Sequence, residues 1–173
     1  MVAKAVRRVM TFLYESPLLE LEIYRLLTIL EASPALAEFE GEGEKDRNGV
    51  VHLRRFEDPE VSRIVVSLAA IVRSSIDANK RYYEIVHKRD LIRFVGTLWP
   101  DADKRAESGL LVFRDACNKT LHADLVEPER TPETLALTGK LVLHGSPMGK
   151  PDVRWEAELD LRKYALTTLF LAP

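Results

Sequence analysis

Two segments near the C-terminus, 135–144 and 154–162, place strong limits on how this chain folds. In both, apolar residues occupy every second position, and mostly polar or small residues fill the places between them. A period of two is typical of a strand that buries one face. The stretch between them, 145–152, contains glycine and proline, so the pair is predicted to form an antiparallel hairpin. Because an isolated hairpin is marginally stable in water, its apolar face must pack on helices or pair with a third strand.

Helical spacing of apolar residues dominates the chain before the hairpin. It predicts a helix over 16–32, interrupted at Pro34, and a second over 58–76 with a wide apolar face that suits the centre of a bundle. A shorter helix is predicted to end at Gly96. Segments 2–14 and 163–171 fit either a helix or a strand, and the acidic, glycine-containing segment 38–48 predicts a loop.

The predicted fold class is therefore mainly α, a helical bundle with a C-terminal antiparallel β-hairpin. The sequence is interpreted as a single domain, 1–173, with a helical part over about 1–127 and the hairpin part over about 133–173.

The stretch 108–124 is interpreted as a helix with two different faces. Leu110, Phe113, Cys117 and Leu121 recur at helical spacing and are predicted to face the core. Arg114, Asn118 and His122 follow one another at intervals of four, so neighbouring side chains lie about 40° apart on an ideal helix. A guanidinium, a carboxamide and an imidazole are thus predicted to share one flank.

This flank suggests chemistry on phosphate. Histidine titrates near neutral pH and suits proton transfer at a ribose hydroxyl, so His122 is the candidate acid or base. Arg114 is the candidate phosphate clamp and Asn118 the group that orients the imidazole. Lys119 and Asp115 are candidate substrate-binding residues. This set requires no metal, and it would cleave RNA by directing the 2′-hydroxyl onto the adjacent phosphate.

A structural interpretation of the same flank remains open. A histidine at the end of a helix interacts favourably with the helix dipole, and an asparagine readily bonds backbone in a nearby loop. In this alternative the chain is a non-catalytic interaction or structural domain, and Arg114, Asn118 and His122 form an internal hydrogen-bond network.

The segment from Arg114 to Ala123, R-D-A-C-N-K-T-L-H-A, resembles bacterial proteins that carry R-E-A-C-N-K-I-I-H-A. More distantly it is similar to the higher eukaryotes and prokaryotes nucleotide-binding (HEPN) superfamily of small helical bundles. Its ribonuclease members carry an arginine, a polar residue and then a histidine, which Arg114, Asp115 and His122 match in kind and order. The resemblance implies an RNA-binding or metal-independent endoribonuclease module of bacterial defence. It also implies a homodimer in which the motif helices of two subunits meet.

Other classes of function find little support in the sequence. The four histidines are far apart, and no paired metal-ligand spacing, glycine-rich phosphate loop or serine-nucleophile motif is present, so neither a metal nor a cofactor is predicted. RNA or a nucleotide is the predicted partner. No apolar run is long enough for a membrane span. The single cysteine, Cys117, is predicted to be buried. Because one cysteine cannot form a disulfide within the chain, the sequence favours a reducing compartment, the cytoplasm.

Overall fold

The structure is a computed structural model that describes residues 16–42, 54–78, 94–149 and 152–171. The described helices are α2 (Ser16–Glu42), α4 (Glu57–Ala78), α6 (Phe113–Leu121) and α7 (Leu161–Leu171). The strands are β1 (Phe94–Trp99), β2 (Gly109–Val112), β3 (Leu125–Arg130), β4 (Leu137–Gly145) and β5 (Trp155–Asp160). They form one antiparallel sheet in the order β2-β1-β5-β4-β3.

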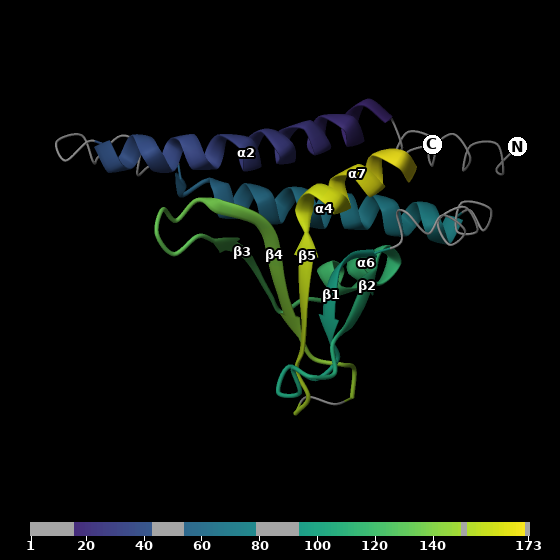
Figure 1. Cartoon of the computed structure of the whole chain (residues 1–173). Coiled ribbons are helices and arrows are strands. Elements are labelled where there is room, and N and C mark those ends of the chain that lie inside the picture. Colours follow the sequence, from purple (N-terminus) through teal and green to yellow (C-terminus); the bar gives the residue numbers. More distant parts are fainter. Residues whose placement is uncertain (1–15, 43–53, 79–93, 150–151, 172–173) are drawn as a thin grey trace, which may run out of the picture.

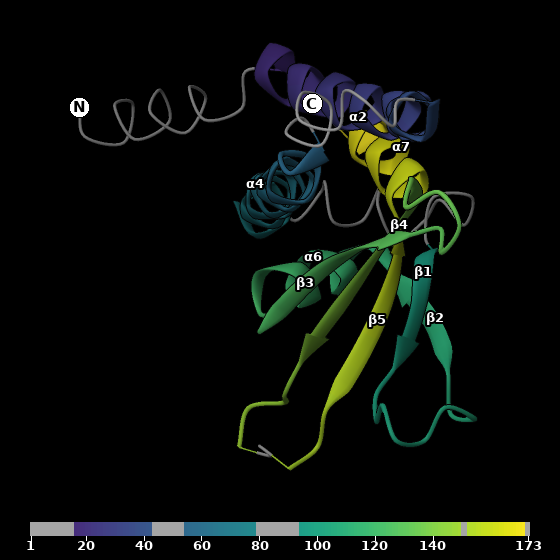
Figure 2. The same ribbon diagram turned by 90° about the vertical axis from the view of Figure 1, so that its left-hand side faces the viewer.

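The long helices lie together across one end of the sheet, and the strands extend away from them (Figure 1). Helix α6 lies against the sheet between the strands and α4, and α4 packs in turn against α2 (Figure 2). The core is built from the inward residues of these layers. From the helices these are chiefly Leu26, Leu30, Ile64, Leu68, Phe113 and Tyr164, and from the strands Leu111, Leu141, Leu143, Trp155 and Leu159.

The two faces of the sheet differ in character. Cross-strand neighbours share a face, and the register aligns Leu98, Ala157 and Leu143 on the covered face. One position further along, Trp99, Glu156 and His144 align on the opposite face, where the side chains are half-buried. We call this second surface the polar face of the sheet.

The expected mainly helical bundle is wrong, because the sheet has five strands and the architecture is α+β. The predicted hairpin is confirmed as β4 and β5, and Trp155 is buried as expected for a core residue. Pairing on both sides extends the hairpin: β1 lies beside β5 and β3 beside β4. Strand β1 occupies part of the segment predicted to be a helix ending at Gly96. Over so short a run, its apolar residues fit the period of a helix as well as that of a strand. The strand forms because the edge of β5 offers backbone groups with which β1 can pair.

The predicted end of the first long helix also needs correction, and the open choice for segment 163–171 is decided. Helix α2 continues through Pro34 to Glu42, so neither the break nor the start of the predicted loop is found. Pro34 is exposed there, and its neighbour Ser33 is buried and accepts a hydrogen bond from the Leu137 amide at 2.9 Å, which anchors this part of α2 to the sheet. The C-terminal segment is a helix, α7. Segment 2–14 lies outside the described residues.

Candidate functional site

Helix α6 is shorter than the sequence predicts. Residues Gly109–Val112 are extended and pair with β1, and the helix begins at Phe113 and ends at Leu121. Leu110, predicted to be a core residue, is 64% exposed as a result. Of the other predicted core positions, Phe113 and Cys117 are fully buried as predicted, and Leu121 is half-buried and packs against the core.

The predicted catalytic residues differ in their exposure. Arg114 and Asn118 are half-buried on α6, and His122 is exposed at the residue that follows the helix. The His122 amide donates to the carbonyls of Asn118 and Lys119, at 3.1 and 3.2 Å, so the backbone there closes the last turn. The exposure of His122 argues against a fully internal hydrogen-bond network.

The two predicted substrate-binding residues lie in different surroundings. Asp115 is exposed in the first turn of α6. The ammonium group of Lys119 lies 3.9 Å from the centre of the Trp155 ring, a cation–π contact, and burial lowers the pKa of this lysine. Lys119 therefore helps to fix α6 against β5, close to Gly145, which pairs with Trp155.

Cys117 belongs to the core. Its sulfur lies 3.5 Å from the Tyr164 hydroxyl, and the Tyr164 ring packs 5.2 Å from that of Phe113. Burial raises the pKa of the Cys117 thiol to about 12, so almost no thiolate forms at neutral pH.

We therefore expect Cys117 to resist alkylation in the folded protein. With iodoacetamide near neutral pH, mass spectrometry should detect modification only after denaturant is added, because both burial and the raised pKa suppress the thiolate. Rapid modification of the native protein would contradict this placement.

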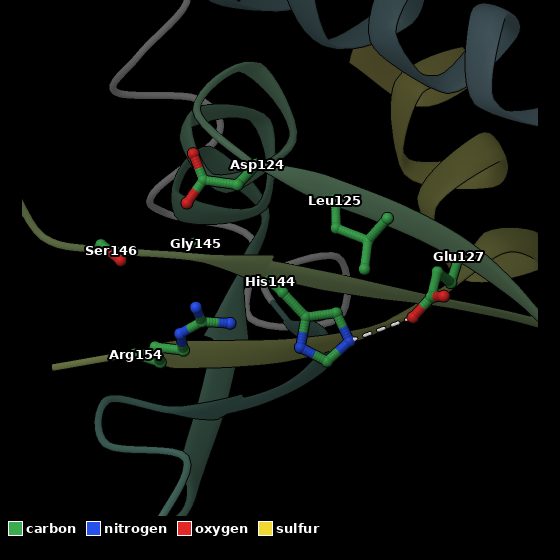
Figure 3. A pocket seen from close by; sticks show the side chains of 7 residues that line it. All are labelled: Asp124, Leu125, Glu127, His144, Gly145, Ser146 and Arg154. Atoms are coloured by element: carbon green, nitrogen blue, oxygen red, sulfur yellow. Dashed lines mark ion pairs between the residues drawn. The ribbon is translucent and has the colours of Figure 1, made fainter. Parts of the chain in front are cut away.

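A hollow of about 500 Å³ lies where α6 passes into β3. Its lining comes from the start of β3, the end of β4 and the residues leading into β5: Asp124, Leu125, Glu127, His144, Gly145, Ser146 and Arg154 (Figure 3). The Asp124 amide donates to the His144 carbonyl at 2.8 Å, which holds this corner together. None of the five residues predicted from the sequence lines the hollow, but Asp124 follows His122 by only two positions.

His144 lies between carboxylates on the polar face. Its Nε2 lies 3.5 Å from the Glu127 carboxylate, the pair joined by the dashed line in Figure 3. Its Nδ1 lies 3.7 Å from the Glu156 carboxylate. When the imidazole is protonated, both contacts are ion pairs. Glu156 also binds the Arg105 guanidinium through two oxygens, at 2.6 and 2.7 Å, and Arg105 stacks on the Trp99 ring at 4.7 Å. His144 is thus oriented by groups from both neighbouring strands.

Sequence reasoning missed His144 and Arg154. Each has a charged or apolar neighbour and no motif, so both resemble ordinary surface residues. The alternation of apolar and polar residues in the two predicted strands could have indicated them. Both occupy polar positions of those strands, near the ends that meet at the hairpin loop. In the folded chain, the hydrogen bond between Asp124 and His144 and the contact of Lys119 with Trp155 bring those ends close to α6.

Comparisons with family models, with characterised proteins and with solved structures found no match to this chain. In the part of the chain that the structure describes, no group of three or more His, Cys, Asp or Glu side chains is placed to hold a metal ion. No described helix combines the length and apolar character that crossing a bilayer requires.

Proposed function

We propose that the protein binds RNA at the corner formed by His122 and the hollow, and that it cleaves RNA there without a metal ion. The observation that carries the proposal is the approach of two histidine backbones at the end of the sheet where α6 leads into β3. Two residues of chain span at most about 7 Å, and Asp124 bonds the backbone of His144, so the backbones of His122 and His144 lie within roughly 10 Å.

The lining of the hollow complements a ribose-phosphate unit. Arg154 offers a guanidinium for the phosphate, and the carboxylates of Asp124 and Glu127 accept hydrogen bonds from ribose hydroxyls. Leu125 provides an apolar contact for a base or sugar. The hollow therefore combines a cationic group for phosphate with acceptors for hydroxyl groups. A nucleotide has both phosphate and hydroxyl groups, whereas a simple anion has no use for the acceptors.

The two histidines suit the two proton transfers of RNA cleavage. His122, which is exposed, takes the proton from the ribose 2′-hydroxyl while that oxygen attacks the phosphorus. The bond from phosphorus to the 5′-oxygen breaks, and His144, which lies between Glu127 and Glu156, acts as the general acid and gives a proton to the leaving oxygen. The products are a 2′,3′-cyclic phosphate and a 5′-hydroxyl. Arg114 and Asn118 are positioning residues in this scheme, on the helix that presents His122.

Binding tests the first half of the proposal. We expect Arg154→Gln to weaken the binding of a fluorescein-labelled single-stranded RNA by about tenfold at low salt, since one phosphate contact is lost. The measurement is fluorescence anisotropy at several salt concentrations, and the slope against salt should become shallower. Arg25→Gln, a change at an exposed arginine on α2, is the matched control and should bind like the wild type. Equal affinity of both variants, or no binding by the wild type, would reject the site.

An interaction domain without catalysis is the second candidate function. Large apolar side chains are exposed along α2, with Leu18 at 59%, Tyr24 at 67% and Phe39 at 65%. Exposed apolar surface of this kind is typical of a protein–protein contact. Failure of the RNA experiments would favour this candidate.

The proposal of an RNA-cleaving protein also includes a cytoplasmic location and a role in bacterial defence.

A further inference from the structure

The two edges of the sheet differ in how they are protected against pairing with another strand. Edge strand β3 carries Pro128 and a break in register between Pro128 and Arg130, and its charged residues are Glu127, Glu129 and Arg130. Proline, bulges and charges are the usual devices that prevent edge-to-edge association. Edge strand β2 reads Gly-Leu-Leu-Val and carries neither proline nor charge. Its pairing with β1 also breaks register, between Phe94 and Gly96, but the extra residue there belongs to β1. Among the described residues, no strand pairs with the outer side of β2.

Strand β2 also exposes apolar surface. Leu110 lies on the polar face of the sheet, opposite Thr97, and is 64% exposed. A leucine at an unprotected edge is stabilised when a second strand covers it.

We propose that β2 is the contact through which two copies of this chain associate. The strands would pair antiparallel about a two-fold axis near Leu110, which joins two five-stranded sheets into one and places the two Leu110 side chains opposite each other. Such a contact is self-complementary, as a two-fold interface requires.

The charges that flank β2 favour a second copy over an unrelated strand. Glu107 precedes the strand by two residues and is exposed, and Arg114 follows it by two residues. In an antiparallel pair, the segment before β2 in one copy lies beside the segment after β2 in the other. Glu107 then approaches the partner's Arg114 and the positive end of the partner's α6, at both ends of the contact. Asp115 projects about 100° away around that helix.

The test compares two exposed edge leucines on the same face of the sheet. Analytical ultracentrifugation should show a dimer for the wild type. We expect Leu110→Lys to raise the dimer dissociation constant by at least about tenfold, since like charges directly opposite each other destabilise a strand pair. Leu125→Lys, on the protected edge strand β3, should leave the constant unchanged. A monomeric wild type, an unaffected Leu110→Lys variant, or equal dissociation by both variants would overturn the proposal.

A second variant serves if Leu110→Lys does not fold. Leu110→Cys should form a disulfide-linked dimer under mild oxidation of a dilute sample, while the buried Cys117 stays reduced. Leu125→Cys should stay unlinked. Equal linking of the two variants, or none, would overturn the proposal as well. Neither the ultracentrifugation nor the disulfide experiment contains RNA, so their results do not depend on whether the protein cleaves RNA.

Discussion

Replacing His122 by alanine is expected to slow RNA cleavage in EDTA by about 10²–10⁴-fold, the contribution of a well-placed general acid or base. His122 is exposed and follows the last turn of α6, so the change removes the base without opening a cavity in the core. The measurement is the appearance of cyclic-phosphate product from a short labelled RNA, resolved by gel electrophoresis. We expect His144→Ala to slow the reaction to a comparable extent.

Two controls separate chemistry from binding and folding. A 2′-deoxy oligonucleotide should bind but remain intact, since it lacks the attacking hydroxyl. The thermal unfolding of His122→Ala should match that of the wild type, because an exposed side chain contributes little to stability. Cleavage by His122→Ala at the wild-type rate would eliminate the proposed mechanism.

Replacing Gly96 by alanine is expected to lower the free energy of unfolding by about 3 kcal/mol, at the upper end of the range for overpacking. A Cβ at this position would overlap the backbone carbonyl of Glu158 and lie 3.1 Å from the Cα of Leu159. Backbone cannot rotate away as a side chain can, so β1 and β5 would have to separate at the centre of the sheet. Urea denaturation followed by circular dichroism measures the change.

Gly109→Ala is the matched control for this substitution. Gly109 lies in the adjacent strand β2, and a Cβ there meets no atom within 4 Å. Its free energy of unfolding should change by less than about 1 kcal/mol, the range of an ordinary glycine substitution. If the two variants unfolded at the same urea concentration, close approach of β5 to Gly96 would not be the reason for glycine at that position.

Part of the candidate site could be predicted from local pattern. The helical spacing of Phe113 and Cys117 identified the buried side of α6, and the same spacing placed Arg114 and Asn118 on a common flank. The hollow could not be predicted, because its lining joins residues from β3, β4 and the loop before β5 that are far apart in the sequence. The placement of Lys119 could not be predicted either, because the packing of α6 on β5 brings its ammonium group onto the ring of Trp155.

By itself, the sequence determined the elements whose pattern is long and regular: the helices α2 and α4, the hairpin of β4 and β5, and the burial of Cys117. In these segments the period of the apolar residues repeats enough times to exclude the other secondary structure. Tertiary structure alone decided the secondary structure of the short segments. There β1 and β2 are strands, and helix α6 begins only at Phe113. A run of four to six apolar residues fits either period, and what selects the strand is the set of backbone hydrogen bonds that an adjacent strand offers.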